Sequence, residues 1–135
     1  MLRRVVMKAT FSYDHIHIRS KDPKGMAEYF NKMFDAEVIE SVQSDGQSRI
    51  DLDINGLAIF IAAVPEDLDL PNSPGTPYLG LDHFGFKVDD VFGAVEELRS
   101  KGAEIVVEPH EIRPGVKIAF VRGPENVRIE LLERE

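Results

Sequence analysis

The sequence contains no cysteine, so disulfide bonds, thiolate metal sites and cysteine nucleophiles are all excluded. It also has no apolar run of 18 residues, which argues against a transmembrane helix and a membrane partner. Cations are scarce as well: 16 Lys and Arg residues face 24 Asp and Glu residues, for a formal net charge of -8. Because nucleic-acid binding needs a basic face, this balance argues against a nucleic-acid partner. Any metal must be held by nitrogen and oxygen, and the expected partner is a small molecule.

The size and composition of the chain are those of an ordinary globular domain. The sequence has 135 residues, of which 43% are hydrophobic and 30% charged. This length is enough to bury a hydrophobic core, and the composition is not that of a disordered chain. Arg3 and Arg4 lie near the N-terminus, but no apolar segment of signal-peptide length follows them. The sequence therefore predicts a cytoplasmic protein with a single domain over residues 1–135.

The first half of the chain predicts one strand, one helix and three more strands. Residues 11–19 alternate with the two-residue period of a strand, and Asp22 followed by Pro23 predicts the start of a helix. Asp45-Gly46 and Asn55-Gly56 are dipeptides favoured in tight hairpin turns. The three strands expected around these turns are residues 37–42, 48–54 and 57–63.

The second half repeats this order after a connector, residues 64–80, that carries four prolines and is interpreted as a linker or a lid. Asp14-His15 recurs as Asp82-His83, and Ile59 corresponds to Ile129, so the halves align with small shifts. The elements expected here are a strand at 81–88, a helix that Gly102 ends, and strands at 104–108, 116–122 and 127–132. The chain is thus predicted to hold two tandem βαβββ modules, at about residues 11–63 and 81–133.

Alternation along the strands predicts which side chains share a face. Ile16 and Ile18 are expected to pack on a helix, as are Phe84, Phe86, Ile129 and Leu131. The opposite face then carries His15, His17, Arg19, His83, Gly85, Lys87, Arg128, Glu130 and Leu132. Two imidazoles and one carboxylate are therefore expected on the same side of the predicted sheets.

The segments DHIHIR, DHFGFK and GPENVRIELL resemble those of the vicinal oxygen chelate superfamily. This superfamily includes glyoxalases, methylmalonyl-CoA epimerases, extradiol dioxygenases, fosfomycin-resistance enzymes and bleomycin-resistance proteins. The resemblance covers about residues 13–133. It implies an α+β, glyoxalase-like fold in which the two βαβββ modules form a cup-shaped, curved mixed sheet.

The resemblance also implies a divalent metal, Mn, Fe, Ni, Co or Zn, held by His15, His83 and Glu130. Phe60 occupies the position of a fourth ligand in glyoxalase I and cannot bind a metal. Such a metal would act as a Lewis acid on neighbouring oxygens of a small carbonyl, carboxylate or phosphonate substrate. Lyase, isomerase or epimerase, thiol transferase and dioxygenase reactions all stay open, and no catalytic acid or base is identified.

Five residues are candidates for substrate binding: His17, Arg19, Phe60, Lys87 and Arg128. The three cations suit an anionic substrate, although charged side chains near strand ends also commonly reach solvent. His17 is either a substrate contact or a wall residue, and Phe60 either a pocket wall or a core aromatic.

Two alternatives to a metalloenzyme stay open: a metal-independent small-molecule binding protein of the bleomycin-resistance type, and a metal-stabilised scaffold without turnover. The cup is built either within one chain or between exchanged modules of a dimer. A homodimer is the expected assembly.

Overall fold

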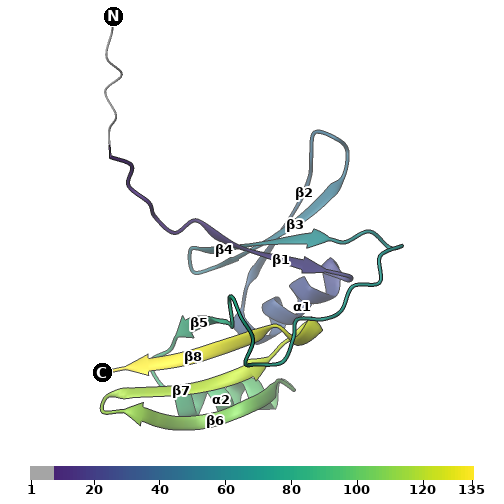
Figure 1. Ribbon diagram of the computed structural model, residues 1–135. Helices are drawn as coiled ribbons and strands as arrows, with labels where there is room; N and C mark the ends of the chain where they lie inside the picture. The colour runs from purple at the N-terminus through teal and green to yellow at the C-terminus, as the bar shows by residue number, and fades with distance from the viewer. Residues whose placement is uncertain (1–7) are drawn as a thin grey trace, which may run out of the picture.

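The computed structural model of the protein describes residues 8–135 and consists of two four-stranded sheets with one helix each (Figure 1). The first sheet has the strand order β1-β4-β3-β2 and the second the order β5-β8-β7-β6. In each sheet the first strand runs parallel to its neighbour and the other pairs are antiparallel. The elements of the first half are β1 His15–Ser20, α1 Pro23–Phe34, β2 Glu37–Val42, β3 Ser48–Ile54 and β4 Leu57–Ala63. Those of the second are β5 Phe84–Lys87, α2 Val91–Ser100, β6 Glu104–Arg113, β7 Val116–Arg122, the short 3-10 helix η1 Pro124–Asn126 and β8 Arg128–Arg134. The predicted α+β class is confirmed.

Both helices begin at an aspartate that caps their first turn. The Asp22 carboxylate accepts a hydrogen bond from the backbone N–H of Gly25 at 3.0 Å, and Pro23 takes the first helical position. The Asp90 carboxylate accepts from the N–H of Gly93 at 3.1 Å in the same way. These caps fix where each chain segment leaves its first strand and turns back over the sheet.

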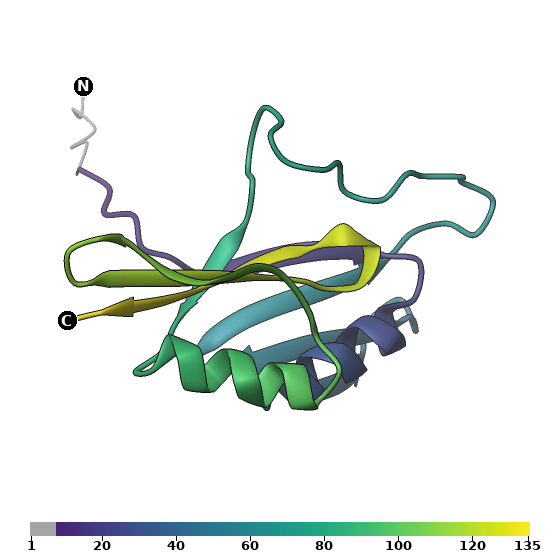
Figure 2. The ribbon, with the colours of Figure 1, turned by 90° about the horizontal axis from the view of Figure 1, so that it is seen from below.

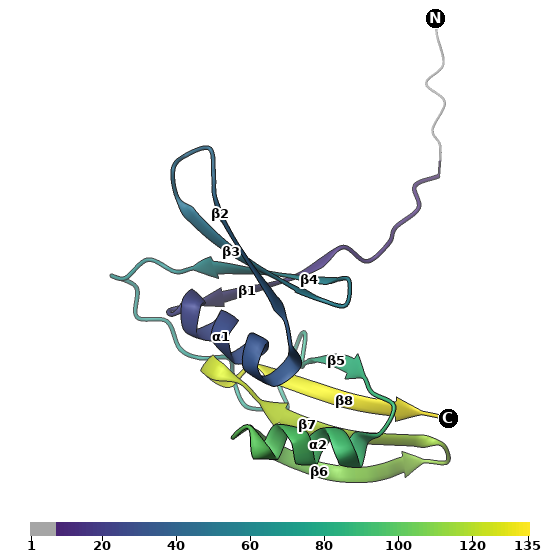
Figure 3. The same cartoon turned by 180° about the vertical axis from the view of Figure 1, so that it is seen from behind.

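The two helices cover the same side of the molecule, and the connector crosses the other side (Figures 2 and 3). Phe30 of α1 is fully buried, and its ring stacks on Phe84 of the second module with 6.3 Å between centroids. The Phe34 ring also contacts that of Phe86, with 5.0 Å between centroids and an angle of 56° between the ring planes. Ile129 and Leu131 are also buried in this shared core, as their alternation predicted. The side chains on the opposite faces of the strands do not belong to this core and are therefore available to form a binding site.

Two strands begin later than the alternation predicted. β1 starts at His15 rather than at residue 11, because its partner β4 starts at Leu57 and the first paired residues are His15 and Ala58. β5 starts at Phe84 rather than at 81, since its first partner is Ile129 in β8. The apolar residues just before these two strands are exposed instead, to 65–92% before β1 and 76–100% before β5: Phe11, Tyr13, Leu79 and Leu81.

β6 is longer than predicted and reaches Arg113 rather than residue 108. It forms a long hairpin with β7 that closes at the pair Arg113 and Val116, and it contains irregularities in register. Such bulges let a strand continue past residues that break the two-residue alternation. The strand predicted from the alternating pattern alone therefore ended too early, at residue 108.

The connector contains neither helix nor strand but is anchored to η1. The backbone N–H of Ser73 donates to the carbonyl of Glu125 at 3.1 Å, and the Asn126 amide donates to the Ser73 carbonyl at 2.8 Å. These contacts hold the middle of the connector over the end of the second sheet. Within residues 8–135, no helix has the length and apolar character needed to cross a membrane.

Candidate metal and substrate site

The strand registers confirm the correspondence between the two modules. His17 pairs with Phe60, and Gly85 pairs with Glu130, so Phe60 and Glu130 occupy equivalent positions. On the next strand Asp51 pairs with Phe60, whereas Phe120 pairs with Glu130. Each module thus has one acid and one phenylalanine at these two positions. In the first module the phenylalanine lies on β4 and the acid on β3, whereas in the second module the acid lies on β8 and the phenylalanine on β7.

The second module brings two of the predicted metal ligands together. His83 Nε2 lies 2.8 Å from Glu130 Oε2, and both side chains are partly buried. Two neighbouring ligands of one first-row metal, each about 2.1 Å from it, lie about 3 Å apart. The ring edge of His83 also packs against Phe120, with 4.8 Å between ring centroids. The pair has the donor types and the spacing that a divalent metal requires.

Asp82 orients the His83 ring. Asp82 Oδ2 lies 2.7 Å from His83 Nδ1, and because a carboxylate only accepts, Nδ1 carries the proton in this contact. The other oxygen of Asp82 accepts a hydrogen bond from the Thr76 hydroxyl of the connector. The hydrogen bonds from Thr76 and His83 lower the pKa of Asp82 below its ordinary value. With Nδ1 protonated, the Nε2 lone pair of a neutral His83 ring would be available to a metal held between Nε2 and Glu130.

We expect Asp82→Ala to weaken binding of the predicted metal by about 10- to 100-fold, because carboxylates that orient ligating histidines typically contribute this much. The measurement is a competition titration against a chromophoric chelator. The exposed Asp89 provides the matched control, Asp89→Ala. Equal metal affinities in Asp82→Ala and in the wild type would contradict the orienting role.

The first module holds His15 in a similar way, but among residues 8–135 it places Phe60 rather than an acid at the position that Glu130 has beside His83. His15 Nδ1 lies 2.7 Å from Asp14 Oδ2, and the ring stacks on Phe60 with 4.2 Å between centroids. Asp51 instead binds Arg49, whose Nε lies 3.0 and 2.9 Å from the two carboxylate oxygens. The acid of this module is therefore neutralised by an arginine rather than directed at the histidine.

One chain does not bring all three predicted ligands together. Across residues 8–135, no three His, Asp or Glu side chains lie close enough to hold one metal ion. His83 and Glu130 form a pair, whereas His15 contacts Asp14 and Phe60. A three-ligand site would thus need His15 from elsewhere.

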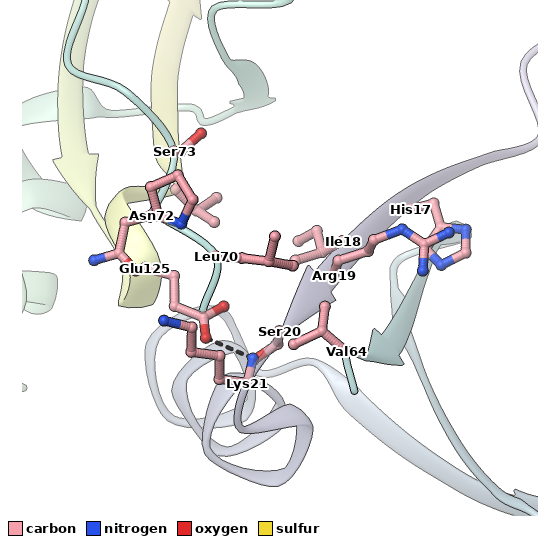
Figure 4. Close-up of a pocket in the computed structure, with 12 residues that line it drawn as sticks. His17, Ile18, Arg19, Ser20, Lys21, Val64, Leu70, Asn72, Ser73 and Glu125 are labelled. Carbon is pink, nitrogen blue, oxygen red and sulfur yellow. Dashed lines mark hydrogen bonds between the residues drawn. The ribbon is translucent and has the colours of Figure 1, made fainter. Parts of the chain in front are cut away.

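The predicted substrate-binding residues line four different cavities. His17 and Arg19 line a cavity of about 290 Å³ beneath the connector, where Glu125 accepts a hydrogen bond from the backbone N–H of Lys21 at 2.7 Å (Figure 4). Phe60 shares a second cavity with His17. Lys87 lines a third, together with residues of both helices, and Arg128 lines a fourth beside Asp82.

Four residues that surround the pair or line the adjoining cavity are not among the predicted site residues: Asp82, Thr76, Phe120 and Arg122. A signal existed for Asp82, because both of the histidines predicted to be ligands follow an aspartate. Thr76 and Arg122 carry no local signal, since their positions depend on the path of the connector and on the pairing of β7 with β8.

The chain belongs to the Glyoxalase/Bleomycin resistance protein/Dioxygenase superfamily, whose family profile matches residues 12–131. A probable chloroplastic lactoylglutathione lyase of Arabidopsis thaliana is 43% identical over 56 residues, which cover 41% of this chain but only 16% of that protein. The uncharacterized protein YwkD of Bacillus subtilis (strain 168) is 30% identical over 128 residues, or 91% of this chain and 97% of that protein.

Solved structures of this superfamily have the same fold. One is a Glu→Gln variant of FosX, a genomically encoded fosfomycin resistance protein from Listeria monocytogenes, in complex with Mn(II) and 1S,2S-dihydroxypropylphosphonic acid. Its TM-score is 0.69 at 20% identity, covering 91% of this chain and 90% of that chain. At this identity the likeness shows the fold alone.

Proposed function

We propose that the protein is a divalent-metal-dependent enzyme that acts on a small, oxygen-rich substrate. The observation that carries the proposal is the His83–Glu130 pair, 2.8 Å apart, with the His83 ring oriented by Asp82. The metal would supply Lewis-acid polarisation of neighbouring substrate oxygens. His83 and Glu130 would hold the metal, Asp82 would keep Nε2 of His83 available, and Phe120 would exclude water from one side of the pair.

The third ligand in this proposal is His15 of a second copy of the chain. Within residues 8–135 of one chain no third ligand joins the pair. His15, like His83, follows an aspartate whose carboxylate lies 2.7 Å from its Nδ1. The exposed apolar residues Phe11 and Tyr13 precede His15, and Leu79 and Leu81 precede His83. A dimer that faces the first sheet of one copy towards the second sheet of the other would cover these residues and complete the site. The proposed assembly is therefore a homodimer.

The relatives support the class of reaction without fixing the substrate. FosX has the same fold and was crystallised with Mn(II) and a phosphonic acid, and the short Arabidopsis match is to a probable lactoylglutathione lyase. Phe60 removes one potential ligand, so the site proposed here has three protein ligands and leaves open positions for substrate oxygens.

The test is turnover by protein stripped with a chelator and then reloaded with Mn, Fe, Ni, Co or Zn. The substrates are hemithioacetals, epoxides and catechols that carry an anionic group. We expect at least one class to be converted, with a loss of about a thousandfold or more on metal removal, because Lewis-acid stabilisation contributes several kcal/mol. The proposal fails if stripped protein converts substrates as fast as reloaded protein. It also fails if stripped protein binds them equally well without turnover, which would favour the binding-protein alternative.

A further inference from the structure

A small cavity lies beside the His83–Glu130 pair, between the connector and the open face of the second sheet. Its volume is about 170 Å³, which is below the size of a drug-sized ligand pocket and suits a single functional group. The connector supplies one wall, and β6, β7, η1 and β8 supply the others. The lining includes Thr76, Tyr78, Asp82, Arg122, Asn126 and Arg128.

Two arginines from neighbouring strands meet in this cavity. Arg122 of β7 and Arg128 of β8 are directly paired in the antiparallel register, so their side chains leave the sheet on the same face. The Arg128 guanidinium lies 4.1 Å from the centroid of the Phe120 ring, which orients its plane. Phe120 also contacts His83, so one aromatic ring supports both the arginine and the ligand pair.

The Arg128 guanidinium has donor capacity to spare. Its Nε is buried and has no hydrogen-bond partner within residues 8–135. The nearest carboxylate oxygen, Asp82 Oδ2, is 3.7 Å away, beyond hydrogen-bonding distance, and Asp82 already binds Thr76 and His83. Arg122 is exposed and forms an ion pair with the exposed Glu104, at 3.4 Å. A buried donor without a protein acceptor is uncommon, and water, an ion or a ligand group usually supplies the acceptor.

We infer that Arg122 and Arg128 form an anion subsite that binds the carboxylate or phosphonate group of the substrate. Arg128 and Glu130 lie two residues apart on one strand face, with about 7 Å between their Cα atoms, so an anion held by Arg128 would lie on the same face as the Glu130 carboxylate. The substrate class is therefore a small acid with neighbouring oxygens at one end and the anionic group at the other. Anion binding is argued from the two arginines alone. The assignment of the anion to the substrate of a metal site rests on the proposed function.

The test is an NMR titration of isotope-labelled, metal-free protein with methylphosphonate and with acetate, at an ionic strength held constant with chloride. We expect saturable shifts at the backbone amides of Thr76, Arg122 and Arg128 for at least one probe. Arg128→Gln and Arg122→Gln should each raise the dissociation constant by about 10- to 100-fold, because each removes charge-assisted hydrogen bonds to the anion. The matched control is Arg113→Gln, at the exposed end of β6, which should leave the constant unchanged.

The tighter of the two probes identifies the anionic group as phosphonate or carboxylate. Absence of saturable shifts with both probes, or dissociation constants unchanged in both glutamine variants, would overturn the inference. Metal uptake by the wild type is measured in parallel. Metal uptake without binding of either anion would refute the anion subsite alone. Anion binding without metal uptake would refute the proposed function and leave the anion subsite standing.

Discussion

Replacing His83 with alanine is expected to remove bound metal from the protein almost completely. The wild type should carry about one ion per chain, because His83 and Glu130 are two of the three ligands of the proposed site. Without the imidazole, Glu130 and a lone distant histidine cannot hold a first-row ion through purification. The measurement is elemental mass spectrometry on protein purified without a histidine tag.

His110 provides the matched control for this experiment. It lies on β6, and its Nδ1 contacts the carbonyl of Glu108 at 3.0 Å, away from the ligand pair. His110→Ala should keep the metal content of the wild type. A wild type that contains no metal and takes up none of Mn, Fe, Ni, Co or Zn on titration would refute the chelate mechanism, and retention of metal in His83→Ala would refute the ligand assignment.

Mixing two inactive variants is expected to restore metal binding. In the proposed dimer each site takes His83 and Glu130 from one chain and His15 from the other. A dimer of one His15→Ala chain and one His83→Ala chain then has one site with both substitutions and one intact site. If the chains pair at random, half of the dimers are mixed, and about one quarter of all sites are intact.

The experiment compares metal content in each variant alone with that of the two variants coexpressed. Each variant alone should be nearly metal-free, and coexpression should recover about one quarter of the wild-type content by the symmetry argument above. A mixture of His83→Ala with Glu130→Ala is the control, because both substitutions fall in the same half-site and no intact site can form. No recovery in the first mixture, with dimers confirmed by light scattering, would refute His15 of the second copy as the third ligand.

The alternation of side chains was enough to predict many of the strands and which of their side chains are buried. Ile18 and Ile129 are buried as predicted, and the first helix begins at the predicted Asp22. The offset between the halves also identified Phe60 as the counterpart of Glu130, and the strand registers confirm this. These features follow from local periodicity and capping, which depend only on residues close together in the sequence.

The remaining features depend on contacts between distant segments. The starts of β1 and β5 are set by the lengths of β4 and β8, which the alternation within β1 or β5 does not encode. Thr76 reaches Asp82 only because the connector folds back over the second sheet, and Arg122 meets Arg128 because the turn through η1 fixes their register. The separation of His15 from the His83–Glu130 pair likewise results from how the two modules pack through Phe30 and Phe84.

That separation has a consequence for how the protein responds to concentration. If His15 is supplied by a second copy, metal binding and chain association are linked by mass action, and each must strengthen the other. Dilution would then release metal as dimers dissociate, and a chelator would shift the protein towards monomers. The same protein would be fully loaded at high expression levels and metal-poor when scarce, so its apparent metal affinity has meaning only at a stated protein concentration.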